Sequence, residues 1–434
     1  MQGDDVREES DSAGGLAGLA LTAVLAGAVA GLLAALLRLC LAEGDALRQR
    51  LVDWSGAAGS LGWIVVILSA AAATALAAAL VRRLAPLAGG SGIPHVEAVI
   101  KGEMQPSPPR LIAVKFVGGL LAIGSGLALG REGPSVQMGA TAAHRIGRWF
   151  RRSERDCVAL LAAGAGAGLA TAFGAPFAGA IFVLEELVRR FDTRITIATL
   201  AASTGAIAVA RTLLSDQPIF ALAPLPNSEL RELPLFVLLG VLAGLLGVAY
   251  NRAIVGTLVA AQRLRALPVQ LRAAGIGAIV GLLACAAPAL VGGGDGLTSA
   301  ALAGQGTLVS IAALFLLRFA LGALSYAALT PGGLFAPLLT LGALTGLGFA
   351  LLCQLLLPHL ALHPAAFAAV GMAAFFTAMV RAPVTGIVLV LEMTALSSQF
   401  LPLLAASAAA MLVAELLRAP PIYDQLRELA AKHR

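Results

Sequence analysis

The sequence predicts an all-α, polytopic membrane protein built from two related halves. Of its 434 residues, 59% are hydrophobic and only 12% are charged, whereas soluble domains carry roughly 25% charged residues. A helix of about 20 residues crosses the bilayer core, and long apolar runs lack the alternation of barrel strands. These runs cover 14–42, 56–81, 110–129, 157–184, 196–210, 233–262, 270–291, 307–330, 333–358, 364–391 and 399–417.

An internal repeat is the second observation. Segment 164–187 overlays 371–394, and both contain an Ala-Pro pair followed by a Leu-Glu pair. Upstream, 130–140 overlays 333–343 at nearly the same offset, and GSG at 90–92 overlays GDG at 294–296. Three elements in one order predict a duplicated half. We therefore expect a polar tail at 1–13, membrane halves at 14–211 and 234–418, a linker at 212–233, and a short cytoplasmic segment at 419–434.

Broken helices are expected in the first half. Arginines cluster at 145–155 and again at Arg189 and Arg190, and both clusters belong on the cytoplasmic side by the positive-inside rule. The roughly 30 residues between them form a helical path of about 45 Å, short of the roughly 60 Å needed to cross and return. Pro176 interrupts this segment. The pattern predicts short, tilted or re-entrant helices that meet inside the protein, as in transporters with internal repeats.

Three turns at apolar depth are candidate anion sites: GSGIP at 90–94, GREGP at 130–134 and GLFAP at 333–337. Proline favours the first helical turn, so each turn predicts a helix start. Unpaired N–H groups at a helix start bind anions without a full positive charge. Ordinary helix-breaking turns are the alternative for any one of them.

Acidic residues within apolar runs are functional candidates because they are expensive at membrane depth. Glu132 lies inside a proposed anion-binding turn, where its carboxylate can compete with an anion and leave when protonated; a salt bridge from Arg131 is the structural alternative. Glu185 and Glu186 precede Arg189 and Arg190 at i,i+4 spacing, so surface ion pairs are their alternative. Because the repeat matches Glu185 with Glu392 and Glu186 with Met393, we interpret Glu185 as architectural.

These motifs, with a C-terminal PxY element, resemble the CLC family of chloride channels and transporters. The resemblance covers roughly 85–418 plus Tyr423. It implies an inverted-topology repeat of two halves with tilted and re-entrant helices, and a homodimer with one anion pathway per subunit. The CBS domains of many eukaryotic members are not expected in the short C-terminal segment. The resemblance also implies a multi-pass protein of the cell inner membrane that exchanges chloride for protons, surrounded by lipid, with bound chloride ions and no other cofactor or metal.

The resemblance assigns roles position by position. Glu132 corresponds to the gating glutamate and Glu186 to the internal proton-transfer glutamate of the antiporters. Ser91 corresponds to the serine that favours chloride over nitrate, while Lys115 and Glu97 are taken as structural. The implied chloride-binding set is Ser91, Gly92, Ile93, Arg131, Gly133, Leu334, Phe335 and Tyr423.

Other functions remain as alternatives. A passive chloride channel lacks the antiporter glutamate, and the intact GREGP and Ser91 argue against a fluoride exporter. An intramembrane aspartyl protease is a distant alternative, because PAL, GxGD and YD occur here in an order unlike that family's. The sequence contains no basic face with interleaved aromatic residues, so nucleic-acid binding is not expected; neither is enzymatic activity.

Overall fold

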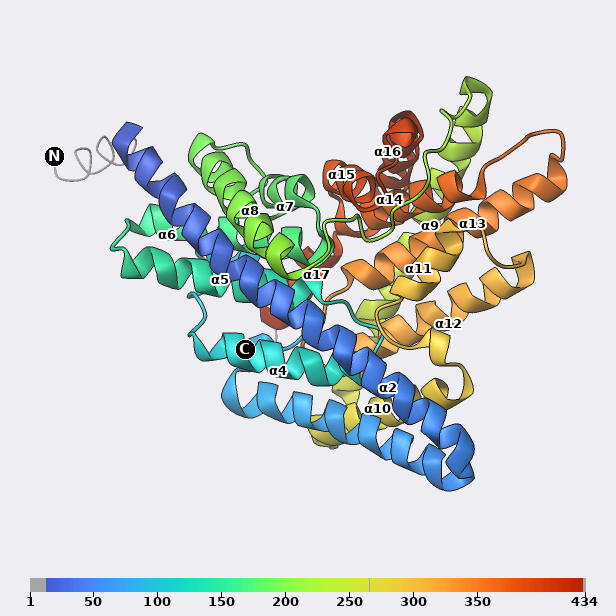
Figure 1. Cartoon of the computed structure of the whole chain (residues 1–434), viewed down its shortest axis with the longest axis horizontal. Coiled ribbons are helices and arrows are strands. Elements are labelled where there is room, and N and C mark those ends of the chain that lie inside the picture. Colours follow the sequence, from blue (N-terminus) through green and yellow to red (C-terminus); the bar gives the residue numbers. More distant parts are fainter. Residues whose placement is uncertain (1–12, 265, 432–434) are drawn as a thin grey trace.

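The computed structural model describes residues 13–264 and 266–431, which are almost entirely helical (Figure 1). Eight helices in this part of the chain are long and apolar enough to cross a membrane. The predicted polar tail lies outside the described residues, except for Ala13. The expected all-α, multi-pass architecture is confirmed.

The first half, coloured blue to green in Figure 1, begins with one long helical segment that bends at Gly59, where φ is 61°. The elements are α2 (Ala13–Leu84), η1 (Pro86–Ala88), α3 (Ile93–Ile100), α4 (Arg110–Gly124), α5 (Glu132–Trp149), α6 (Glu154–Phe173), α7 (Pro176–Phe182), the π-helical turn η2 (Val183–Leu187) and α8 (Thr193–Leu213). The short helix α3 precedes three longer helices, and the short α7 precedes the long α8.

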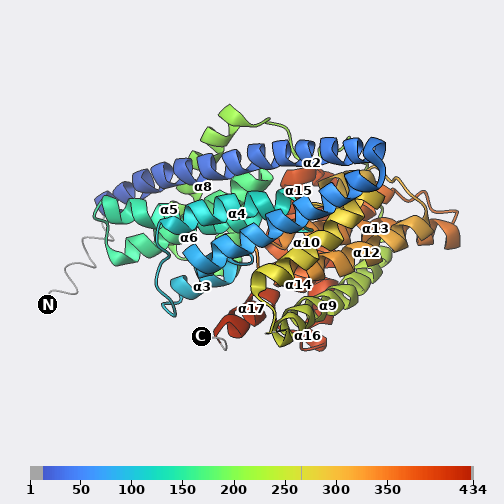
Figure 2. The same cartoon turned by 90° about the horizontal axis from the view of Figure 1, so that it is seen from below.

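The second half, yellow-green to red, repeats this order, and α10 packs along α2 of the first half (Figures 1 and 2). A last helix, α17 (Ile422–Ala431), follows it. The elements are η3 (Leu230–Glu232), α9 (Leu233–Arg263), α10 (Val269–Ala286), η4 (Pro288–Leu290), α11 (Asp295–Leu302), α12 (Leu308–Tyr326), α13 (Phe335–Leu356), α14 (Pro364–Val380), α15 (Pro383–Thr394), η5 (Ser397–Gln399) and α16 (Phe400–Leu416).

Backbone conformation at equivalent positions confirms the repeat. Helices α3 and α11 both contain eight residues, and each follows a left-handed glycine, Gly92 with φ 83° and Gly294 with φ 101°. Helices α6 and α14 both end at a left-handed residue, Gly174 with φ 63° and Arg381 with φ 70°. The two halves therefore share local backbone geometry as well as motif order.

Two buried cations occupy equivalent positions in the halves. Lys115 of α4 donates from Nζ to the carbonyls of Ala88 and Gly90, at 3.0 and 2.8 Å. Arg318 of α12 likewise binds the carbonyls of Leu290, Gly292 and Gly293. Each cation thus satisfies carbonyls in the turn before a short helix, and these contacts agree with a structural role for Lys115.

Helices α7 and α15 cap each other: Glu392 near the end of α15 binds the start of α7, and Glu185 in η2, directly after α7, binds the start of α15. Each carboxylate accepts hydrogen bonds from N–H groups that have no partner within their own helix. Glu392 of α15 accepts from the N–H groups of Phe177 and Ala178, at 3.1 and 2.8 Å. Glu185 accepts from the N–H groups of Val384 and Thr385 and from the Thr385 hydroxyl, at 3.0, 2.7 and 2.7 Å. This reciprocal arrangement is the one that an inverted repeat produces.

The predicted break at Pro176 is confirmed, but only one of the two pieces is short. α7 has seven residues, whereas α6 runs for 20 residues and is almost wholly buried. Small residues allow this burial: a Cβ at Gly164 would lie 2.4 Å from the Gly139 carbonyl oxygen of α5. Close packing against α5 therefore accounts for the burial of α6.

Candidate anion and proton site

Three glycine-containing turns meet at the centre of the molecule and are joined by backbone hydrogen bonds. The N–H of Gly130 donates to the Gly333 carbonyl at 2.9 Å, and the N–H of Gly333 returns a bond of 2.7 Å. Gly90 donates to Thr330 at 3.0 Å and accepts from Gly332 at 3.2 Å. The starts of α3, α5 and α13 are held together in this way, so helix N-termini from both halves converge on one region.

Close backbone approach explains the glycine in the first turn of α5. A Cβ at Gly133 would lie 2.7 Å from the Ser91 carbonyl oxygen and 3.0 Å from the Gly333 Cα. Both neighbours are backbone atoms and cannot move aside as a flexible side chain can. Gly133 therefore permits the three turns to meet, and the GREGP motif encodes this contact locally.

Glu132 lies fully buried at the first position of α5. Its Oε1 accepts a hydrogen bond from the N–H of Ala336 at 3.3 Å, and the carboxylate also interacts with the N–H groups of Phe335 and of Glu132 itself. Oε2 has no hydrogen-bond partner among the described residues. The carboxylate thus occupies the start of α13, where backbone N–H groups stabilise negative charge.

Ser91 and Tyr423 bring two hydroxyl groups to this region, and both residues are at most 1% exposed. The Tyr423 hydroxyl lies close enough to Ser91, Glu132 and Glu186 to interact with them. Neither hydroxyl makes a hydrogen bond of good geometry within the described chain. Because buried polar groups are nearly always hydrogen-bonded, these hydroxyls are available as donors to an anion. The Tyr423 ring stacks on Phe335, with ring centroids 6.2 Å apart.

The other residues of the predicted chloride-binding set lie at the same helix starts. Gly92 and Ile93 begin α3, and Leu334 precedes Phe335 at the start of α13. The guanidinium of Arg131 is used differently: it binds Asp295 of the second half at 3.0 Å and the Ala172 carbonyl at 3.2 Å. The Arg131 side chain thus links the two halves, and only the backbone of this residue is left to bind an anion.

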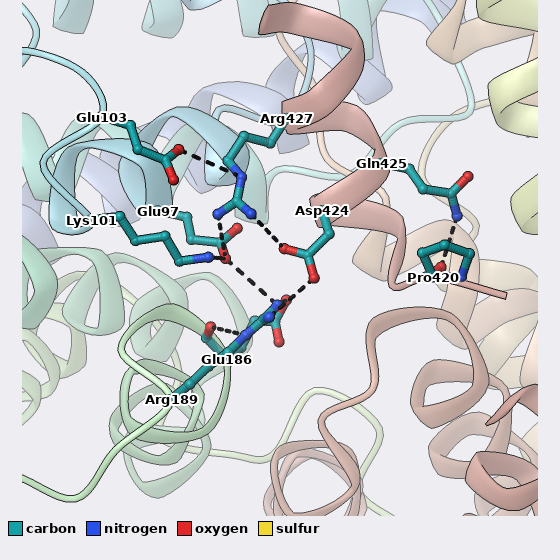
Figure 3. Close-up of polar contacts among 9 residues, drawn as sticks. All are labelled: Glu97, Lys101, Glu103, Glu186, Arg189, Pro420, Asp424, Gln425 and Arg427. Carbon is teal, nitrogen blue, oxygen red and sulfur yellow. Dashed lines mark hydrogen bonds and ion pairs between the residues drawn. The ribbon is translucent and has the colours of Figure 1, made fainter. Parts of the chain in front are cut away.

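Glu186 lies in η2, 2% exposed, beneath a network of charged side chains (Figure 3). Its Oε1 lies 3.5 Å from Nη2 of Arg189, whose Nη1 donates to Asp424 of α17 at 3.0 Å. Partial burial lowers the pKa of Arg189, but Glu186 and Asp424 more than offset this, so its pKa is raised above the ordinary value. The guanidinium consequently remains charged.

Sequence reasoning missed Asp424 and Arg427 in this network. The position of Asp424, directly after Tyr423, was the one available signal. Arg427 binds Glu97 at 3.1 Å, a contact between segments too distant in sequence for any local pattern to reveal.

A cavity of about 510 Å³ extends from the Ser91 turn to α17. Its lining combines apolar surface with a few polar groups. Among the lining residues are Ser91, Gly92, His95, Tyr326, Glu103 and Arg427. The cavity gives the serine turn a route toward the end of the molecule that carries the C-terminal helix.

The fold and site define a membrane protein with an internal repeat whose broken helices meet at its centre. Residues 73–415 match the family model described as "Voltage gated chloride channel", and the chain belongs to this family. It is 39% identical over 377 residues to the H(+)/Cl(-) exchange transporter ClcA of Vibrio campbellii, covering 86% of this chain and 81% of that one. The Cronobacter sakazakii protein of the same name is 38% identical over 374 residues, covering 84% and 80%.

Solved structures show the same architecture. A slow cyanobacterial Cl-/H+ antiporter superposes with a TM-score of 0.91 at 32% identity, covering 96% of this chain and 99% of that chain. A CLC-type fluoride/proton antiporter gives a TM-score of 0.79, covering 95% and 98%, but its 22% identity shows a shared fold alone. The expected CLC architecture is therefore confirmed.

Proposed function

We propose that the protein exchanges chloride for protons across the membrane. The observation that carries this proposal is the Glu132 carboxylate, which accepts from the Ala336 N–H group at a helix start. A chloride ion is stabilised by the same donors, so the charged carboxylate and chloride compete. Protonation removes the competing charge, and chloride entry and proton uptake become linked events. The exchange transporters and the antiporter to which the chain is similar support this function.

The remaining site residues supply donors without a fixed positive charge. The hydroxyls of Ser91 and Tyr423 bind a central chloride, and the N–H groups of Leu334 and Phe335 contribute from α13. Gly92, Ile93, Arg131 and Gly133 contribute through the backbone at the starts of α3 and α5. Weak, neutral donors suit transport because an ion must leave as well as bind.

Glu186 transfers protons between the cytoplasmic side and Glu132 in this proposal. Its burial and its interaction with Tyr423 support this assignment. A passive chloride channel, the second candidate, needs no such residue.

Flux measurements in liposomes distinguish the antiporter from the channel. Purified protein under a chloride gradient should move protons against their own gradient, recorded with chloride and pH electrodes together. Glu186→Gln keeps the side-chain shape but cannot titrate, so chloride movement should continue while proton pumping disappears. Glu43→Gln, an exposed glutamate of α2, is the matched control. No proton movement by the unmodified protein would favour the channel; full coupling in Glu186→Gln would refute the assigned role.

The protein is further proposed to be a homodimer in the cell inner membrane. Helices α7 and α15 carry Phe177 and Val384, which are 64% and 50% exposed, beside the reciprocal glutamate caps. A second subunit would cover this apolar face. Light scattering of the detergent-solubilised protein should give twice the 43.8 kDa chain mass, and the chain mass alone would exclude the dimer.

A further inference from the structure

Arg189 covers Glu186 on its outer side. The Glu186 side chain is 3% exposed, whereas that of Arg189 is 38% exposed, and the two charged groups lie 3.5 Å apart. The Nε of Arg189 also donates to the backbone carbonyl of Glu186 at 3.2 Å. Solvent therefore reaches the guanidinium but not the carboxylate beneath it.

Asp424 holds Arg189 in this covering position. Nη1 of Arg189 donates to Oδ2 of Asp424 at 3.0 Å, joining the loop after η2 to the first turn of α17 (Figure 3). Asp424 directly follows Tyr423, whose hydroxyl lies near Ser91 and Glu132. Consecutive residues of one helix turn thus contact the cover over Glu186 and the inner side of the anion site.

A second set of contacts fastens α17 to α3. Glu97 is fully buried and lies near three cations: Lys101 at 2.7 Å, Arg427 at 3.1 Å and Arg189 at 3.6 Å. Arg427 also contacts Asp424 at 3.2 Å and Glu103 at 3.8 Å. Glu97 is therefore the buried centre of the network, whereas the side chains of Glu103 and Arg189, 51% and 38% exposed, lie at its solvent-facing edge.

We propose that the Arg189–Asp424 ion pair is a latch that closes Glu186 to cytoplasmic water and opens only when the first turn of α17 moves. Since Tyr423 belongs to that turn, the same movement shifts the phenol that borders the anion site. Proton access and inner anion access are then two results of one displacement. This inference rests on the proposed function, in which Glu186 transfers protons. In this inference Arg189 and Asp424 neither transfer protons nor bind chloride; they act by controlling access to Glu186 and the position of Tyr423.

Thiol labelling tests the latch without measuring transport. With Glu186→Cys as a reporter, a small neutral methanethiosulfonate should label this position slowly while Asp424 is present. Adding Asp424→Asn keeps the side-chain size but removes the charge that holds Arg189, so labelling should become at least tenfold faster. Asp424→Glu, which keeps the charge, should restore slow labelling. Mass spectrometry of purified protein gives the rates, and the unmodified chain supplies the background from its native cysteines.

Glu103→Gln is the matched control, because it weakens a peripheral contact of α17 without touching Arg189. Labelling in this background should match that of the reporter alone. If Asp424→Asn leaves the labelling rate unchanged, or if Glu103→Gln accelerates it equally, the latch is rejected.

Transport by variants that retain Glu186 provides the second readout. Asp424→Asn should lower the number of protons moved per chloride by at least twofold, because both routes open more often. A merely structural role for the ion pair would reduce both fluxes together and leave the ratio unchanged, which would overturn the proposal. The unmodified protein in the same assay tests antiport itself: if it pumps protons while the Asp424→Asn ratio is unaltered, only the latch fails.

Discussion

Substitution of Glu132 should separate chloride transport from proton transport. Glu132→Gln keeps the volume but is permanently uncharged, imitating the protonated form, so chloride should pass without proton flux and without pH dependence from this group. Glu132→Ala should leave space for an additional anion beside the Ala336 N–H group, detectable as anomalous bromide density in a crystal. Liposome flux with chloride and pH electrodes measures the first effect. Proton-coupled uptake that survives in both variants would refute the mechanism.

Selectivity between anions is predicted to depend on the Ser91 hydroxyl. A hydrogen bond to a charged partner contributes about 1.5–3 kcal/mol, so Ser91→Pro should lower the chloride-to-nitrate flux ratio by about tenfold. The substitution also removes the N–H that donates to the Tyr326 hydroxyl at 3.3 Å. Ser91→Ala, which retains this N–H, is the comparison variant and should show most of the loss. Equal flux ratios before and after both changes would contradict a role for Ser91 in anion binding.

Local chemistry made some residues of the site predictable and left others hidden. Glycine and proline in the three turns specify helix starts by their own backbone preferences, and the structure has helices starting at Ile93, Glu132 and Phe335. The pairing of Arg131 with Asp295 spans 164 residues, and nothing in either local sequence specifies it. For the same reason, the charged network around Glu97 emerged only from the structure.

Among the helices, the reciprocal caps of α7 and α15 should stabilise the fold without taking part in transport. A glutamine retains one acceptor oxygen, so Glu392→Gln should cost about 1.5–3 kcal/mol, the range of one hydrogen bond to a charged group. Glu185→Gln should cost more, since Glu185 accepts three bonds where Glu392 accepts two. Thermal unfolding in detergent measures the difference. An altered number of protons per chloride in either variant would contradict a purely architectural role.

The extents of individual helices show where sequence patterns are insufficient. Two apolar runs in the first 84 residues predict two crossings, but the polar stretch between them, 43–55, is also helical and the break falls at Gly59. The stretch contains one glycine, Gly44, and no proline, so the helix propensity of its other residues continues the helix beyond the apolar boundary. The repeat, by contrast, correctly identified Glu185 as architectural, because Glu185 caps α15 as its counterpart Glu392 caps α7. The role of Glu186 stays a prediction.

For the molecule as a whole, the anion site draws on both halves, and neither half should form it alone. Ser91 and Glu132 come from the first half, whereas Phe335 and Ala336 come from the second half and Tyr423 from α17, which follows it. A chain divided between Asp216 and Gln217, which are exposed in the loop after α8, should assemble from two co-expressed pieces. The rest of that loop stays bound to α15 through backbone bonds to Met393 and Thr394.

Affinity purification through a tag on the first piece should recover the second piece, and the complex should bind chloride in isothermal titration. Each piece expressed separately should show no chloride binding. Chloride binding by the first piece alone would show that α13 and α17 are dispensable, contrary to the site described above.

The reciprocal caps also impose an order on the folding of the chain during its synthesis. The first turn of α7 receives its carboxylate partner from a residue 215 positions further along. At about 5–20 residues per second, the ribosome delivers Glu392 roughly 10–40 s after Phe177. Throughout that interval the amide groups at the start of α7 have no carboxylate from α15 to bind, within a bilayer that offers few alternatives. The contact between α7 and α15 is therefore completed only after most of the second half has been synthesised, and a nascent chain arrested before Glu392 should expose α7 to proteases.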